Sequence, residues 1–256
     1  MAAARTAKQC MRGASNIGER GLAVIATVLS AVAGYIDALG WLLFSHVYVA
    51  NMSGNSIALG RNLVEDRLAA AAARVWPIVT FALGLFVSEL LYELAKRRGR
   101  PSSMSWTLSL DAAAIGLLLV LPWPATQQQF GMSYFVPTGL LALAMGLQNA
   151  SLVRIGASSV YTTHVTGNLT RLAREAAHVL LPDAARERRR SRRRVLLMAA
   201  LWSAYTIGSA LGALAVARFH RYGALAAVVV LVALVVFDRL KPIGGHEPPA
   251  EANPIF

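Results

Sequence analysis

The chain of 256 residues is 56% hydrophobic and 15% charged, with a mean hydropathy of +0.50. Soluble domains carry roughly 25% charged residues, so this composition excludes an ordinary soluble domain and predicts an integral membrane protein. The net charge of +12 is gathered in short basic segments between apolar runs, which follows the positive-inside rule and argues against a nucleic-acid partner. The single cysteine, Cys10, excludes disulfides and cysteine metal clusters within one chain.

The first half of the chain opens with a polar, basic segment, residues 1–20, which we expect to be retained and cytoplasmic. Residues 21–60 follow and contain only Asp37 and His46 among acidic, basic and histidine side chains. This stretch is too long for one helix across a ~30 Å apolar core. It therefore holds either two crossings or one crossing and a re-entrant half-helix. Residues 76–94 and 105–121 are each expected to span the membrane.

The second half repeats this order. Residues 133–170 form another long stretch with the same two alternatives, and residues 195–217 and 222–240 are long enough to span. Residues 182–194 contain seven arginines, and we expect a solvated cytoplasmic loop that touches anionic lipid. The tail, residues 241–256, is rich in proline and glycine and is expected to be disordered.

Two similar pairs of motifs mark an internal repeat. Gly-Tyr-Ile-Asp-Ala at residues 34–38 precedes Asn-Met-Ser-Gly-Asn at 51–55, and Gly-Leu-Gln-Asn-Ala at 146–150 precedes Thr-His-Val-Thr-Gly-Asn at 163–168. Gly34 and Gly54 are 20 positions apart, and Gly146 and Gly167 are 21 apart. Such a repeat predicts two copies of one structural unit.

The distribution of basic residues favours six spans over eight. With one crossing in each long stretch, the basic segments at residues 96–100 and 171–194 face the cytoplasm, and the uncharged loop at 127–129 faces out. Three spans per copy make the copies inverted, a transporter and channel architecture. We therefore predict an all-α polytopic membrane protein of two inverted three-helix repeats, residues 21–125 and 126–240. Each copy is expected to carry a re-entrant or broken half-helix at its Ser/Thr-Gly-Asn motif.

These paired motifs resemble the bacterial YoaK-like family of inner-membrane proteins, a domain of unknown function. The resemblance covers about residues 20–240, with Ser53 where the family more often has threonine. It implies a multi-pass protein of the bacterial inner membrane and supplies little about activity.

The two Ser/Thr-Gly-Asn triplets are predicted to start short helices, because hydroxyl and amide oxygens cap helix N-termini and glycine admits a close neighbour. If both starts face one central site, their free N–H groups would attract anions or polar oxygens. The alternative is that the glycines only allow packing and the hydroxyls only cap. The candidate substrate-binding residues are Asp37, Asn51, Ser53, Gly54, Asn55, Gln148, Asn149, Thr163, Thr166, Gly167 and Asn168.

Carboxylates inside the predicted spans are candidates for coupling to protons or cations. Asp37 either carries a coupling proton or forms a structural ion pair with Arg154, and its repeat counterpart is Asn149. Glu89 is a weaker second candidate. Asp111 is expected to be partly hydrated, close to the start of its span.

Other residues are read as structural. Glu93 lies one turn from Lys96 and is expected to form an interfacial ion pair. His46 and His164 are expected to have hydrogen-bonded structural roles, because they lack partners at metal-ligand spacing. Gly208 and Gly212 predict close helix packing, either within the chain or between protomers.

The resulting hypothesis is an inner-membrane transporter or channel for a small polar or anionic solute, coupled to protons through Asp37. The alternative is a non-transporting protein of membrane assembly or lipid interaction. We find no catalytic set and no phosphate-binding loop, so no enzyme activity, cofactor or metal is predicted. The expected partners are the bilayer, the solute and a second copy of the chain.

Overall fold

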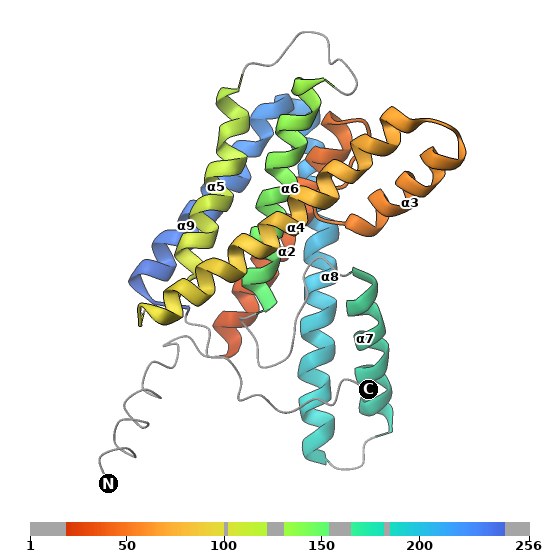
Figure 1. Cartoon of the computed structure of the whole chain (residues 1–256). Helices are drawn as coiled ribbons and strands as arrows, with labels where there is room; N and C mark the ends of the chain where they lie inside the picture. The colour runs from red at the N-terminus through yellow and green to blue at the C-terminus, as the bar shows by residue number, and fades with distance from the viewer. Residues whose placement is uncertain (1–18, 100–101, 122–130, 154–164, 182–184, 244–256) are drawn as a thin grey trace.

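A computed structural model describes residues 19–99, 102–121, 131–153, 165–181 and 185–243. These residues form helices and their connections, with no strand among them. The helices are α2 (Glu19–Leu43), α3 (Met52–Val64), α4 (Leu68–Arg97), α5 (Met104–Val120), α6 (Met132–Val153), α7 (Val165–Leu180), α8 (Ala185–Phe219), the 3₁₀ turn η2 (His220–Gly223) and α9 (Ala224–Leu240). Figure 1 shows the long helices gathered in one bundle, with α3 beside the first part of α4 and α7 beside the first part of α8.

Helix length decides how the two long apolar stretches are organised. The 13-residue α3 and the 16-residue α7 are about 20 Å and 24 Å long, too short to cross a ~30 Å core as helices. Each stretch therefore holds one long helix and one short helix. By length and composition, the described stretches able to cross a membrane are Arg20–Leu43, Leu68–Arg97 and Ser191–Leu240, and Met104–Val120 is a shorter apolar helix.

The outer faces of the long helices are apolar. On α4, Val79, Leu83, Phe86 and Leu90 are exposed at spacings of four, three and four residues, which places them on one stripe. α8 and α9 carry similar exposed apolar residues. Soluble monomers rarely expose contiguous apolar surface on this scale, so these stripes suit contact with lipid.

Two pairs of helices cross at matching positions of the repeat. Added Cβ atoms at Gly34 of α2 and Gly208 of α8 would overlap the carbonyl oxygens of Tyr205 and Ala31 respectively. Added Cβ atoms at Gly146 of α6 and Gly84 of α4 would overlap those of Phe81 and Leu143. The equivalent residues are 112 positions apart in α2 and α6 (Ala31 and Leu143, Gly34 and Gly146) and 124 apart in α4 and α8 (Phe81 and Tyr205, Gly84 and Gly208). The α2–α8 crossing therefore repeats as α6–α4.

The order of contacts gives the directions of the α2–α8 and α5–α9 pairs. Ser30 of α2 donates to the Leu201 carbonyl of α8 at 2.9 Å, and Tyr35 lies against Gly212. The residue numbers of the contacting pairs increase together, so α2 and α8 run in the same direction. Along α5 and α9 they run oppositely, with Asp238 at the start of α5 and Val228 at Gly116.

The α4–α6 and α5–α6 pairs follow the same logic. Tyr134 donates to the Ala73 carbonyl at 3.3 Å, ahead of the Gly84–Gly146 crossing, so α4 and α6 run in the same direction. Ser151, near the end of α6, donates to Thr107, near the start of α5, so α5 and α6 run oppositely.

The Gly208–Gly212 prediction is now specific. Both glycines face α2 of the same chain, against Ala31 and Tyr35. Their close packing therefore lies within the chain, as in small-residue crossings of membrane helices.

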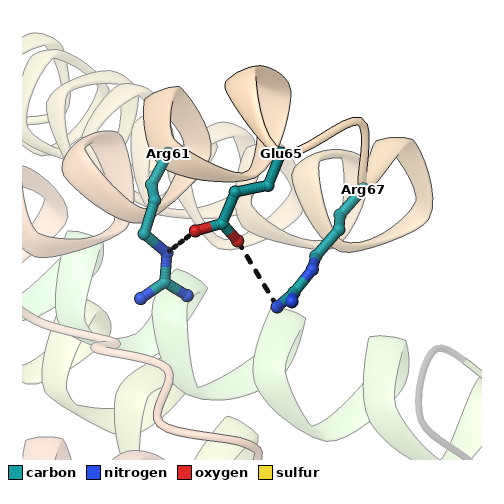
Figure 2. A network of polar contacts seen from close by, with 3 residues as sticks. All are labelled: Arg61, Glu65 and Arg67. Atoms are coloured by element: carbon teal, nitrogen blue, oxygen red, sulfur yellow. Dashed lines mark ion pairs between the residues drawn. The ribbon is translucent and has the colours of Figure 1, made fainter.

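The α3–α4 hairpin closes through a charged turn. Glu65 lies between Arg61 and Arg67, with N–O separations of 3.7 Å and 3.4 Å (Figure 2). All three side chains are well exposed, so these pairs contribute little to stability. They do bring a negative charge to two arginines, Arg61 and Arg67.

Two sequence expectations are wrong. The arginine-rich segment is not a loop after residue 184, because α8 begins at Ala185 and carries the arginines. Arginine is a good helix former, and the spanning part continues without a break. Asp111 is also not hydrated, since it is 0% exposed within α5. The register of α5 turns this residue toward the bundle.

Candidate functional site

The chain turns back on itself after α2. Ser45 and His46 both have positive φ, and the Arg74 guanidinium of α4 donates to their carbonyls at 2.8 Å and 2.9 Å. The following segment then lies against α2 at Gly40, where an added Cβ would be 2.9 Å from the Val47 carbonyl oxygen. Residues 47–51 are non-helical and return about 9 Å along α2, from the level of residue 43 to that of residue 37.

Asp37 holds this buried segment. Its Oδ1 accepts the N–H groups of Val49 at 2.7 Å and Ala50 at 2.8 Å, and its Oδ2 accepts the hydroxyl of Tyr205 from α8. Asp37 is 3% exposed and Val49 is fully buried. Buried backbone N–H groups need acceptors, and the carboxylate supplies them at the start of α3. Its negative charge also suits the positive end of that helix.

The first triplet receives the ring and backbone of Tyr48. An added Cβ at Gly54 would lie 2.5 Å from Cδ2 of the Tyr48 ring. The Asn55 side chain donates to the Tyr48 carbonyl and accepts its N–H at 3.2 Å. Trp41 packs on the same ring with centroids 4.7 Å apart. Glycine and asparagine in this triplet thus fix the returning segment onto α3.

The hydroxyl of the first triplet does not cap α3, contrary to the alternative in which the hydroxyls serve as caps. The helix begins at Met52, so Asn51 is its N-cap residue and makes no side-chain capping bond. Ser53 is exposed and donates instead to the Asn51 side chain at 2.6 Å. Ser53 is therefore the member of the triplet that the described contacts leave most accessible.

The second copy is described in part. Its triplet, Thr166-Gly167-Asn168, lies in the first turn of α7, as predicted, but the structure does not describe these side chains. Thr163, Arg154 and His164 lie outside the described residues, so the expected Asp37–Arg154 pair and the role of His164 stay predictions.

Gln148 and Asn149 of the second copy are both buried in α6. The Gln148 amide donates to the Leu29 carbonyl of α2 at 2.8 Å, while its Oε1 has no donor. Asn149 Oδ1 has no donor either. At this crossing the position equivalent to Tyr205 is Phe81, whose side chain has no hydroxyl.

The remaining candidates are on the surface. Glu89 is exposed on α4, whereas Asp37 is buried on α2. Glu93 pairs with Lys96 at 4.0 Å, as predicted. The His46 ring meets Trp41 edge-on at 4.6 Å, and its carbonyl accepts from Arg74, which agrees with a structural role.

Sequence reasoning did not pair Tyr205 or Tyr48 with this site, and it expected Asp111 to be partly hydrated. Tyr205 is 168 positions from Asp37, and no local pattern links them. Tyr48 carries no signal apart from its place before the triplet. The two oxygens of Asp111 are buried and have no hydrogen-bond partner among the described residues, and its occurrence within an apolar helix is the sequence signal for a functional carboxyl.

The described donor set does not resemble a metal centre. Among the residues that the structure describes, no group of three His, Cys, Asp or Glu side chains lies close enough to hold a metal ion. What the arrangement offers is a largely buried non-helical segment between α2 and α3, with hydroxyl, amide and carboxyl groups around it.

Comparison with known proteins agrees with the family resemblance. Residues 25–237 match a family described as protein of unknown function (DUF1275). The chain is 23% identical over 222 residues to the UPF0700 transmembrane protein YoaK of Bacillus subtilis (strain 168), covering 85% of this chain and 94% of that protein. No solved structure matches.

Proposed function

The chain belongs to the DUF1275 family of proteins of unknown function and is similar to a transmembrane protein of Bacillus subtilis, and from this premise we propose that the chain is a transporter or channel. Its solute is small and polar or anionic. The chain has six spans in two inverted repeats and lies in the bacterial inner membrane, with both termini in the cytoplasm.

The observation that carries this proposal is the buried return of residues 47–51 to Asp37. At membrane depth, non-helical backbone is tolerated only inside protein or beside a water-filled cavity. Transporters use such broken helices to build solute sites near the midplane, at the interface of their repeats. The first triplet lies at this break, and the second triplet lies at the equivalent helix start.

Helix directions support inverted repeats. α2 runs with α8, α4 runs with α6, and α5 runs against both α6 and α9. After the short η2 turn, α9 runs in the direction opposite to α8 (Figure 1). With these relations, α2, α5 and α8 share one direction, and their counterparts α6, α9 and α4 share the other. A pseudo-twofold axis in the membrane plane has this effect.

The nature of the site differs between the two helix starts. Asp37 already brings a carboxylate to the start of α3, while the equivalent position before α7 is the neutral Asn149. An anionic group would therefore be favoured at the start of α7, and a neutral polar group at the start of α3.

Solute-uptake profiling in proteoliposomes tests the proposal. Ser53→Ala and Thr166→Val should reduce flux of the transported solute much more than they reduce the melting temperature in detergent. Gly60→Ala is the control, because an added Cβ there meets nothing within 4 Å. A folded wild-type protein that moves no solute of a broad panel, or triplet variants whose flux equals that of the control, would contradict it.

A non-transporting role at the lipid surface is the second candidate, and α7 favours it. Leu169 and Leu180 are exposed on one face of this helix, and Arg174 is exposed on another. Such an amphipathic face suits the boundary of an anionic membrane. If the folded protein moves no solute and its binding to lipid vesicles depends on anionic lipid, this role is favoured.

A further inference from the structure

We propose that Asp111, and not Asp37, is the proton-binding carboxyl of this protein. Asp111 holds a proton inside the bundle and exchanges it with water when the helices move apart. On release the O–H bond breaks, the proton passes to water and the electron pair stays on the carboxylate; uptake is the reverse. The use of this proton in coupling rests on the proposed transport function, whereas the binding site itself does not.

Asp111 is the most isolated carboxyl of the described chain. It is 0% exposed, and neither Oδ1 nor Oδ2 has a hydrogen-bond partner. An ionised carboxylate without donors is very costly to bury, so such a group takes up a proton and becomes neutral. Ionisable groups buried within membrane helices are functional candidates for the same reason.

Two other buried oxygens, at about the level of Asp111 along the α5–α6 pair, lack a donor among the described residues. Ser151 of α6 donates to Thr107 of α5 at 2.8 Å, and the two helices run in opposite directions. Asp111 lies one turn after Thr107, and Gln148 lies one turn before Ser151, so both are at the same level of the α5–α6 contact. Gln148 Oε1 and Asn149 Oδ1 are acceptors without donors. A protonated Asp111 introduces an O–H group at this level.

Among the described residues, no charged side chain on an element packed against α5 forms a hydrogen bond with Asp111. Asp238 is bonded to Ser102 and the Ser105 N–H at the start of α5, about 9 Å along the helix from Asp111. Glu89 and Glu93 of α4 lie toward the surface. The other ionisable residues on elements that contact α5 are Tyr134 on α6, Arg239 on α9, Arg74, Tyr92, Lys96 and Arg97 on α4, and His220, Arg221 and Tyr222 in η2.

Asp37 makes the opposite arrangement. Both of its oxygens accept hydrogen bonds from the protein, and two of the donors are N–H groups of the returning segment, residues 47–51. Protonation of Asp37 would break contacts that fix the start of α3, so this carboxyl is suited to a structural role. The counterpart of α5 in the repeat, α9, is wholly apolar from residue 224 to residue 237. The repeat architecture therefore does not require the Asp111 carboxyl.

Infrared spectroscopy of the purified full chain in lipid nanodiscs tests the assignment. At neutral pH the wild type should show the C=O stretching band of a protonated carboxylic acid. Asp111→Asn should remove that band, and the matched control Asp37→Asn should keep it. If Asp111→Asn does not fold, Asp111→Glu should keep an acid band at a shifted frequency.

Three results would overturn the proposal. They are the absence of an acid band in the wild type, a band that survives Asp111→Asn, and a band that appears only when Na⁺ is removed, which would make the site a sodium site.

A second measurement separates proton binding from coupling. In proteoliposomes, Asp111→Asn should lower proton-gradient-driven uptake at least tenfold and leave solute exchange unchanged. Unchanged gradient-driven uptake would overturn the coupling role. If Asp111→Asn removes the acid band but the wild type moves no solute, the proton site is upheld and the proposed transport function is overturned.

Discussion

The two copies of the repeat share their helix crossings and differ in chemistry at the break. In the first copy Asp37 faces Tyr205 and holds the buried backbone of residues 49 and 50. In the second copy the equivalent positions are Asn149 and Phe81, which offer neither the carboxylate nor the hydroxyl. The backbone crossing is the same, so the difference lies in one carboxylate and one hydroxyl. The starts of α3 and α7 therefore differ in the polar groups near them, although the helix crossings beside them are alike.

The shared crossings should give the largest effects. Gly34→Ala and Gly146→Ala both place a Cβ on a backbone carbonyl of the facing helix. Backbone cannot yield as a side chain can, so each change should cost about 3 kcal/mol or more. Thermal unfolding in detergent measures this. Gly60→Ala should be neutral or slightly stabilising, and a large difference between Gly34→Ala and Gly146→Ala would break the equivalence.

The carboxylate of the first copy should come next. Asp37→Ala leaves two buried N–H groups and the Tyr205 hydroxyl without their acceptor, a loss of about 2–4 kcal/mol. Asp37→Asn should cost much less, because its Oδ1 can keep both N–H bonds and Tyr205 can accept from the amide. Urea unfolding of the two variants checks the order, and equal losses would refute this role for Asp37.

The Tyr48 clamp should give a smaller effect. Asn55→Ala removes two hydrogen bonds to the Tyr48 backbone, for a loss of about 1–3 kcal/mol. Ser53→Ala should change stability by about 0.5 kcal/mol or less, since Ser53 is exposed and bonds only to Asn51. Protection of residues 47–51 from hydrogen exchange should fall in Asn55→Ala alone. A similar fall in both variants would mean that the hydroxyl also holds the segment.

The smallest effect concerns the α7–α8 hairpin of the second copy. Burial raises the pKa of Glu175, but hydrogen bonds from Arg194 and Ser191 outweigh it, so the net pKa is below its usual value. A lowered folded pKa means that this pair stabilises the protein above about pH 4.3 and loses the effect as pH falls through the lowered pKa. The protection of α7 from hydrogen exchange, corrected for the intrinsic exchange rate at each pH, should therefore fall on acidification.

Glu175→Gln is the control for this titration. It should abolish the pH dependence in α7 at acidic pH and raise exchange slightly at neutral pH. An unchanged acid response in Glu175→Gln would assign the effect to another group.

Much of this fold follows from apolar length. The runs that became α5 and α9 were predicted almost to the residue, and the two triplets were placed in the first turns of α3 and α7. The start of α8 was missed because a run of arginines is read as solvated loop, although arginine is a good helix former. An apolar run does not show where its helix starts when the first turns of that helix are basic.

The site was less predictable because its contacts join distant parts of the chain. Tyr205 reaches Asp37 only because the glycine crossing brings α8 against α2. The burial of Asp111 could not be predicted from α5, since the helix is apolar on all faces after residue 111 and its polar residues before that point do not mark one side. Gly54 was expected to admit a ligand, and the described ring beside it belongs to Tyr48.

The α2–α8 crossing also sets an order of assembly during synthesis. α2 ends at residue 43 and α8 begins at residue 185, so 142 positions separate a helix from its main partner (185 − 43). At ribosomal rates this delay is on the order of ten seconds. α4 and α6 are complete before α8 emerges, so their crossing forms first. The face of α2 around Gly34 stays uncovered in the nascent chain until α8 closes over it.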